Sequence, residues 1–223
     1  MKILLVSYGS MGDVRPLLAL GQVLREQGHR IRVCAPPDSR PLFTGAGIRF
    51  SSLGGNVRQL MDAQADQFIG RPFAAAAPMT RALWKELETQ FRRLPREMAA
   101  VDLVISAGLA MAVPSLAEAI GVPYRYAVSI PALLPSRCHA PVTVPWQNLP
   151  AFCNLALWRI GDWLLDLGYK PLINRHRRGL GLAPLDHLMP HVTANLIVSA
   201  DKELAPLPPE APPDCRQTGY WHT

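Results

Sequence analysis

The sequence lacks the patterns that mark several common functional classes. Its four cysteines form no C-x-x-C pair and lie near no histidines at metal-ligand spacing, so no metal site is expected. Scattered cysteines of this kind are typical of a reduced chain, and we expect a cytoplasmic protein. The formal net charge is +6, yet no dense basic run is interleaved with aromatic residues. This argues against a nucleic-acid partner.

The sequence also lacks a long apolar segment. The N-terminal apolar run ends after about six residues and soon meets Asp13, which makes it too short for a signal peptide. The least charged long stretch, residues 138–158, is interrupted by prolines. We therefore expect no transmembrane segment, while peripheral contact with a membrane stays open. A hydrophobic fraction of 49% indicates a folded chain with a substantial core.

The first sixteen residues, MKILLVSYGSMGDVRP, organise the rest of the chain. Residues 2–7 form a short apolar run bounded by glycine, which predicts a buried strand. Gly9 and Gly12 break the run, and helical spacing begins at Arg15. A buried strand, a glycine turn and a helix open a doubly wound α/β domain, in which ligands lie beyond the carboxyl ends of the strands. Asp13 lies at this position, where we expect the chemistry.

Strand and helix patterns alternate along the remaining chain. Strands are predicted at 30–35, 48–51, 101–106, 123–130 and 195–199, with a last short strand or a linker at 217–221. Helices are predicted at 16–27, 79–99, 111–120 and 152–168, the last with an extension toward 178. The alternation predicts a mostly parallel sheet with helices on both faces. Residues 54–78 are expected to form a mobile excursion with partial helix, and 131–150 a long functional loop.

Two finer expectations concern the long helices. Pro95 is expected to kink the helix 79–99 or to end it early. In the helix 152–168, five apolar residues recur at helical spacing and are expected to form its buried stripe: Phe152, Leu155, Ala156, Trp163 and Leu167.

The motifs resemble those of a known family. Gly9-Ser-Met-Gly-Asp13-Val-Arg-Pro16-Leu-Leu-Ala-Leu20, followed by Gly28-His29, is similar to the opening of family 1 GT-B glycosyltransferases. The resemblance is strongest to bacterial enzymes that glycosylate glycopeptide and polyketide antibiotics and to sterol glucosyltransferases. It continues through further short matches, namely Cys34-Ala-Pro-Pro-Asp38, Thr89-Gln-Phe91, Ile120-Gly-Val-Pro-Tyr124 and Ala205-Pro-Leu207, and ends at Gln217-Thr-Gly219.

The resemblance implies that residues 1–223 are the acceptor-binding N-terminal domain, a Rossmann-like half of such an enzyme. The family's C-terminal domain carries a His-rich glycine turn of the H-x-G-x-G-T type, which has no match here. The isolated chain is therefore expected to be inactive without that nucleotide-sugar-binding domain. The implied reaction is an inverting, metal-independent transfer from a UDP- or TDP-sugar co-substrate, with no cofactor. The implied acceptor is a hydroxyl of a bulky apolar molecule, such as a glycopeptide, polyketide, sterol or lipid.

Such a transfer needs a base for the acceptor hydroxyl and hydrogen-bond donors or positive charge for the departing diphosphate. Asp13 occupies the base position of the glycopeptide-type enzymes. In the alternative interpretation Asp13 only caps a helix that starts at Val14, and one residue could do both. Gly9, Ser10 and Gly12 are expected close to the donor phosphates, unless they serve only the turn.

The acceptor pocket is expected to be made by segments that overhang the strand ends. Its candidate residues are Met11, Phe73, Trp84, Ser129, Pro131 and His139, with Phe68 nearby. Aromatic side chains fill cores as readily as they line sites, so a core position stays open for each aromatic residue. His139 could equally be an ordinary loop histidine.

Two other functions compete with sugar transfer. An NAD(P)-dependent oxidoreductase would show G-x-G-x-x-G and an acidic residue near the end of the second strand. This chain has G-x-x-G-D, and its second strand ends in Cys34-Ala-Pro-Pro, so both parts of that signal fail. A non-catalytic module that binds an aglycone or a partner protein stays open.

Overall fold

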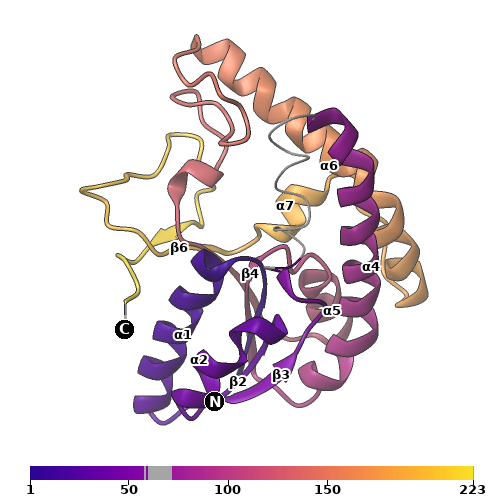
Figure 1. The fold of residues 1–223 in the computed structure, drawn as a ribbon, viewed down its shortest axis with the longest axis vertical. Coiled ribbons are helices and arrows are strands. Elements are labelled where there is room, and N and C mark those ends of the chain that lie inside the picture. Colours follow the sequence, from indigo (N-terminus) through magenta and orange to yellow (C-terminus); the bar gives the residue numbers. More distant parts are fainter. Residues whose placement is uncertain (58, 60–71, 223) are drawn as a thin grey trace.

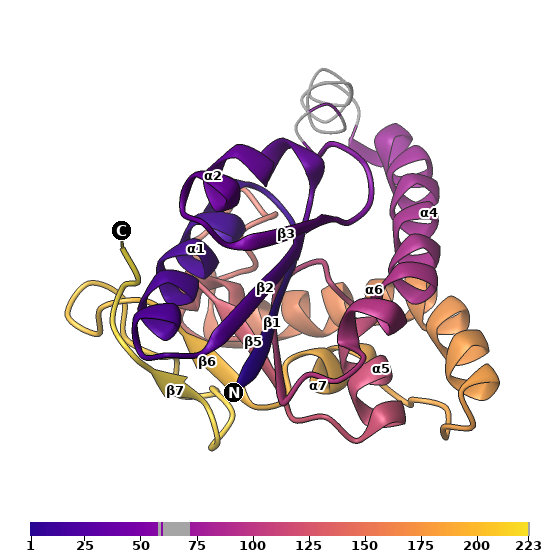
Figure 2. The ribbon, with the colours of Figure 1, turned by 90° about the horizontal axis from the view of Figure 1, so that it is seen from below.

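The computed structural model describes residues 1–57, 59 and 72–222, with side chains in the last range described from residue 80 onward. A single sheet of parallel strands organises this part of the chain (Figures 1 and 2). Its seven strands, all paired in parallel, run in the order β3-β2-β1-β4-β5-β6-β7. They are β1 (Lys2–Tyr8), β2 (Arg30–Ala35), β3 (Arg49–Ser52), β4 (Leu103–Gly108), β5 (Tyr124–Val128), β6 (Leu196–Val198) and β7 (Arg216–Gln217).

Helices cover both faces of the sheet, which confirms the predicted doubly wound α/β class. One face packs against α1 (Met11–Glu26) and α2 (Arg40–Gly45). The other packs against four helices, α4 (Pro72–Met98), α5 (Val113–Ile120), α6 (Ala151–Gly179) and α7 (Leu188–Val192). Two short 3-10 helices, η1 (Pro37–Ser39) and η2 (Pro131–Leu133), follow the ends of β2 and β5.

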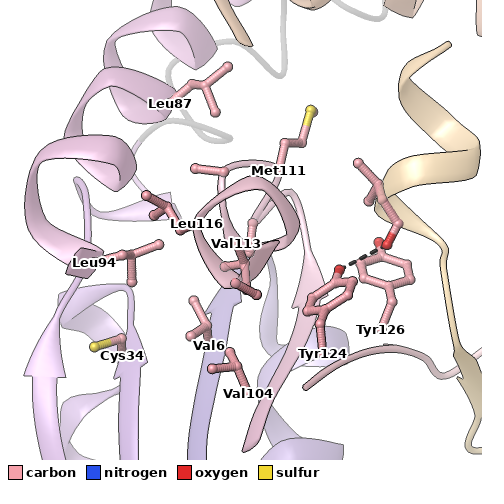
Figure 3. Packing of buried hydrophobic residues seen from close by; sticks show 14 of the residues in the cluster. Val6, Cys34, Leu87, Leu94, Val104, Met111, Val113, Leu116, Tyr124 and Tyr126 are labelled. Atoms are coloured by element: carbon pink, nitrogen blue, oxygen red, sulfur yellow. Dashed lines mark hydrogen bonds between the residues drawn. The ribbon is translucent and has the colours of Figure 1, made fainter. Parts of the chain in front are cut away.

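The two layers of core follow from the alternation of side chains along buried strands. In β1, Leu4 and Val6 belong to the core on the α5 side, and Ile3 and Leu5 to the core on the α1 side. Figure 3 shows the first of these cores, with α5 packed against the sheet at Val6. Because both faces of β1 are covered, the strand is a continuous apolar run.

The first helix begins earlier than the sequence pattern suggested. We expected α1 to start at Pro16, but it starts at Met11 and contains Pro16 within it. Pro16 lies in the second turn, where a missing backbone N–H removes only one bond of the helix.

Pro95 does not end α4 early, which corrects one of the two outcomes expected for it; the expected kink stays a prediction. The helix continues through Pro95 to Met98, where Leu94 and Met98 are fully buried against the sheet. Burial of these two side chains stabilises the last turn by more than the one hydrogen bond that proline removes.

Helix α6 runs to Gly179, as the predicted extension suggested, but its predicted buried stripe is wrong. Phe152, Trp163 and Leu167 are 73%, 61% and 63% exposed. The side that packs inward instead carries Asn154, Asp166, Tyr169, Leu172, Ile173 and Arg177. The helix therefore presents an apolar face to the outside, opposite the face that it buries. Among the described residues, no helix is both long and apolar enough to cross a membrane.

Candidate functional site

The strand order reverses between β1 and β4, and the predicted site lies at that point. From β1 the chain proceeds to β2 on one side, and from β4 it proceeds to β5 on the other. Such a reversal leaves a crevice at the carboxyl ends of the two strands, where ligands of doubly wound folds bind. We call this region, made by the glycine turn 9–13, Gly108 and Ser129, the strand mouth. Its two strands are tied together because the Leu109 N–H donates to the Tyr8 carbonyl at 2.7 Å.

A capping box fixes the conformation of the glycine turn. Ser10 is the N-cap of α1, and its Oγ accepts from the Gly12 N–H at 3.3 Å. In return, Asp13 Oδ2 accepts from the Ser10 N–H at 2.9 Å. The cap is thus Ser10 rather than Asp13, and Asp13 supports it from the third position of the helix. Among the described residues only Ser10 bonds to this carboxylate, and only at Oδ2.

Two glycines allow the chain to close around the Asp13 carboxylate. A Cβ at Gly9 would overlap Asp13 Oδ2, and a Cβ at Gly108 would lie 2.7 Å from the Tyr8 carbonyl oxygen and 3.3 Å from Asp13 Cγ. Gly108 also has a φ of +65°, which side-chain-bearing residues rarely adopt. Any larger residue at either position would displace the carboxylate.

Burial raises the pKa of Asp13 above its ordinary value, and the hydrogen bonds from Ser10 work in the opposite direction. The pKa of Tyr126 is also raised, mainly by its own burial and to a smaller extent by the negative charge of Asp13. The Tyr126 hydroxyl donates to the Gly108 carbonyl at 2.9 Å. A carboxylate with a raised pKa is a stronger base than a fully solvated one, provided that it stays ionised at the working pH.

Ser129 hydrogen bonds to a carbonyl of the glycine turn that has no donor within α1. Pro16 has no N–H, so the Gly12 carbonyl lacks the helical donor four residues later. The Ser129 hydroxyl donates to this carbonyl instead, at 3.4 Å. The end of β5 is thereby attached to the first turn of α1, and Ser129 lies at the strand mouth with Asp13.

The other predicted acceptor residues are spread over a wider area. Met11 is 38% exposed at the start of α1, while Pro131 is buried in η2. Trp84 is anchored to α6, since its Nε1–H donates to the Gly168 carbonyl at 2.7 Å. His139 also contacts α6, because the Trp158 Nε1–H donates to its carbonyl at 3.1 Å and the two rings meet edge to face.

Two aromatic candidates fall outside this description. Phe73 lies at the start of α4, and its side chain is not among those that the structure describes. Phe68 lies outside the described residues altogether.

The outward face of α6 was missed as part of a candidate site. Its apolar residues, which we call the α6 apolar stripe, are Phe152, Ile160, Trp163, Leu164 and Leu167, and each is at least half exposed. In Figure 1 the first half of α6 lies beyond the carboxyl ends of the strands, beside the loop 131–150. Helical spacing revealed the stripe in the sequence, but spacing does not tell whether a stripe faces the chain's own core.

A doubly wound sheet with a glycine turn and a carboxylate at its point of reversal defines a ligand-binding α/β domain. Comparison with known proteins then identifies its family. The model of the glycosyltransferase family 28 N-terminal domain matches residues 3–136, so the chain belongs to this family.

Curated relatives confirm the resemblance to antibiotic and sterol glycosyltransferases. Glycosyltransferase GtfE of Amycolatopsis orientalis is 34% identical over 228 residues, which cover 99% of this chain and 54% of the relative. The vancomycin aglycone glucosyltransferase of the same organism is 31% identical, with 99% and 54% covered. A sterol 3-beta-glucosyltransferase of Yarrowia lipolytica is 26% identical, with 97% and 15% covered. The chain thus spans about half the length of the antibiotic-type relatives.

Solved structures of GT-B glycosyltransferases share the fold. The glycotransferase of kitacinnamycin superposes with a TM-score of 0.61 at 14% identity, with 92% of this chain and 47% of that chain covered. Glycosyltransferase VinC in complex with DTDP gives a TM-score of 0.57 at 17% identity, with 95% and 52% covered. At these identities the likeness shows the arrangement of the sheet and helices alone.

Proposed function

We propose that this chain binds the acceptor in an inverting, metal-independent transfer of a sugar from a nucleotide donor, with Asp13 as the general base. The observation that carries the proposal is the carboxylate of Asp13 at the strand mouth, held at Oδ2 by Ser10 and desolvated enough to raise its pKa. The glycosyltransferase relatives support sugar transfer as the reaction class.

The reaction assigned to Asp13 is a single displacement. As the acceptor oxygen attacks the anomeric carbon, the bond from that carbon to the nucleoside diphosphate breaks, and the hydroxyl proton passes to the carboxylate. Oδ2 is occupied by Ser10, so the proposal gives the proton to Oδ1. Attack from the face opposite the leaving group inverts the anomeric configuration.

The glycine turn has fewer free donors for the diphosphate than its sequence suggested. The N–H groups of Ser10 and Gly12 are already bonded, to Asp13 Oδ2 and Ser10 Oγ respectively. The Ser10 hydroxyl donates to Asp13 Oδ2 over a long 3.4 Å. In our proposal this hydroxyl turns to the phosphates, which also lie at the positive end of the α1 dipole, and Gly9 keeps the approach open. The donor in our proposal is a TDP- or UDP-sugar. One curated relative, 33% identical with 99% of this chain covered, is named a dTDP-epi-vancosaminyltransferase, which supports the TDP form. The remaining donor contacts would come from a second domain.

The acceptor in this proposal is bulky and apolar. The α6 apolar stripe supports it, because five large apolar side chains exposed on one helix face form a patch of the kind that marks binding surfaces. Met11 and Ser129 would meet the acceptor near its reacting hydroxyl, and the loop 131–150, which holds Pro131 and His139, would meet it farther out. Trp84, whose indole N–H donates to α6, would contribute from α4.

The test joins this chain to the donor-binding half of the GtfE relative and measures transfer from TDP-glucose and UDP-glucose to vancomycin aglycone and to cholesterol. Asp13→Asn removes the base but preserves an acceptor for the Ser10 N–H, and we expect kcat to fall by about 10²–10⁴-fold. Asp186→Asn is the matched control, since Asp186 is exposed in the loop before α7. It should transfer like the parent chimera. Equal activity of the Asp13→Asn and parent chimeras would leave Asp13 as a capping residue only.

A non-catalytic binding module is the alternative function. It predicts that an aglycone raises the melting temperature of the 223-residue chain, since a ligand that prefers the folded state stabilises it, while every chimera fails to transfer sugar. Transfer by the parent chimera excludes this alternative.

A further inference from the structure

The structure holds a second polar region, at the outer edge of the sheet. A cavity of about 710 Å³ lies between the edge strand β3 and the second half of α4. We call it the β3–α4 groove. Among the described residues, four arginines line it, Arg40, Arg92, Arg93 and Arg96, against one acidic residue, Glu97. The strand mouth is two strands away, which corresponds to about 10 Å across the sheet.

Two of the arginines converge on one residue of β3. Arg40 Nη2 donates to the Ser52 hydroxyl at 3.2 Å, and Arg93 Nη1 donates to the Ser52 carbonyl at 3.1 Å. The Arg40 guanidinium also lies over the Phe50 ring, 5.1 Å from its centre, which holds its plane in a fixed direction. Ser52 thus brings two guanidinium groups, from α2 and from α4, to one place in the groove.

The positive charge of the groove is not balanced within the described residues. Glu97 is already engaged, because the Ser51 hydroxyl donates to it at 2.7 Å and Arg32 lies 3.8 Å from it. None of the four lining arginines forms an ion pair with another described residue, and those that hydrogen bond do so to neutral oxygens. Cations gathered in a concave site raise the local potential and attract anions.

We propose that the β3–α4 groove binds a small molecule that carries at least two phosphate groups. The planar fork of an arginine matches the geometry of a phosphate and binds it through two hydrogen bonds, and several arginines together favour a polyphosphate over a carboxylate. The volume lies within the range of small-molecule sites. This inference does not depend on the proposed sugar transfer, because it uses other residues, at the β3 edge of the sheet instead of between β1 and β4.

Titration calorimetry with inorganic pyrophosphate on the 223-residue chain tests the proposal. Arg40→Gln with Arg93→Gln should raise Kd by about tenfold or more, because two charge-assisted contacts are lost. The matched control, Arg30→Gln with Arg178→Gln, removes two exposed charges elsewhere and should stay within about twofold. Arg93→Lys keeps the charge but loses the fork, and a clear loss there assigns bidentate binding. Circular dichroism and melting of each variant confirm that it is folded.

Two further measurements define the site and the source of the phosphate. Asp13→Asn should bind pyrophosphate like the parent. A clear fall in Kd in that variant, caused by the removal of a repelling carboxylate, would place the anion at the strand mouth and overturn the proposal. Vesicles of phosphatidylcholine with phosphatidic acid distinguish the sources. Vesicle binding without pyrophosphate binding, lost in the Arg40→Gln, Arg93→Gln variant, assigns a lipid monophosphate and overturns the proposal. Pyrophosphate binding without vesicle binding supports a soluble molecule with two or more phosphates. Binding of neither probe, or an equal loss in the control variant, overturns the proposal.

Discussion

The strand mouth and the β3–α4 groove belong to the same sheet but differ in charge. The carboxylate at the mouth is hydrogen bonded within the chain, whereas the arginines of the groove have no acidic partner among the described residues. At the mouth, the Asp13 carboxylate is bonded to Ser10, and even the Gly12 carbonyl left without a helical donor finds a hydroxyl. In the groove, arginines such as Arg40 and Arg93 reach only neutral oxygens, so their charge is left unmatched in the part of the chain that the structure describes.

This difference teaches what each region can do. Internal hydrogen bonds at the mouth fix one carboxylate in one place, which is what a general base requires, since catalysis depends on a small distance between base and proton. Unmatched guanidinium groups instead favour an anion from outside, because binding then supplies the charge that the chain does not. The mouth is therefore suited to chemistry and the groove to binding.

Crowding the strand mouth should have a larger effect than any change in the groove. In Gly9→Ala the new Cβ would overlap Asp13 Oδ2, so the carboxylate or the turn must move. We expect a loss of about 1–3 kcal/mol in the free energy of unfolding from overpacking. If Asp13 is the base, as proposed, the kcat of the chimera should fall by about 10²-fold, because the carboxylate is misplaced. Urea denaturation and chimera kinetics measure the two effects.

Gly45→Ala is the control for this substitution. Gly45 ends α2, and a Cβ there meets nothing within 4 Å. Its effect on stability should be neutral or slightly favourable, because alanine restricts the unfolded chain more than glycine does. If Gly9→Ala were equally harmless, the close packing around Asp13 would not matter to the site.

A smaller effect is expected when a negative charge is removed from the β3–α4 groove. Glu97→Gln removes the acidic residue that lines the groove in the described part of the chain, and we expect the Kd for pyrophosphate to fall by about threefold through reduced repulsion. Ser51 keeps a hydrogen-bond acceptor in the glutamine, so the fold should be preserved. An unchanged Kd would show that the anion binds beyond the reach of Glu97.

The pH dependence of stability follows from the direction of the pKa shift at Asp13. Burial raises this pKa above 3.8, so in the window above 3.8 the folded state binds more protons than the unfolded state. The contribution of Asp13 to the free energy of unfolding is thus present below that window. It is lost as the pH rises through the pKa that Asp13 has in the folded state. Glu118 behaves oppositely, because the hydrogen bond from Arg177 lowers its pKa and its contribution is lost as the pH falls.

Urea denaturation of the parent and of Asp13→Asn between about pH 3.5 and 7 checks this prediction. The difference in unfolding free energy, parent minus variant, should decrease with rising pH and then level off, because asparagine does not titrate. A difference that stays constant with pH would mean that burial does not change the protonation of Asp13.

The sequence predicted the order of strands and helices well, because that order depends on local signals. Short apolar runs and glycine stops fixed the order of strands and helices, and the strand mouth followed from the first strand and its turn. The early start of α1 was missed because Pro16 was taken as the first helical residue. The signal was nevertheless present, since Ser10-x-x-Asp13 resembles a capping box with aspartate in place of glutamate.

The features that the sequence did not predict depend on contacts between distant segments. Tyr169 and Ile173 turn α6 so that its apolar stripe faces outward, and no local pattern reveals which face of a helix finds the core. The β3–α4 groove joins Arg40 with Arg93, which lie 53 positions apart, so their juxtaposition exists only once the sheet has formed.

The smallest effect concerns the hydroxyl that replaces a missing helical donor. Ser129→Ala leaves the Gly12 carbonyl without its bond, and because that bond is long, at 3.4 Å, we expect a loss of no more than about 1 kcal/mol in unfolding free energy. Pro16→Ala would restore an N–H four residues after Gly12. In that background Ser129→Ala should be nearly neutral, since the carbonyl then has a helical donor.

A double-mutant cycle over Ser129→Ala and Pro16→Ala measures this coupling by thermal and urea denaturation. A coupling energy comparable to the single effect of Ser129→Ala assigns the bond to the vacancy that proline creates. Additive effects would mean that whatever Ser129 contributes to stability does not come from its bond to the Gly12 carbonyl, and that this bond does not attach β5 to the glycine turn. The mouth would then lose the cross-strand bond that distinguishes it from the groove, and its fixed geometry would depend on the capping box alone.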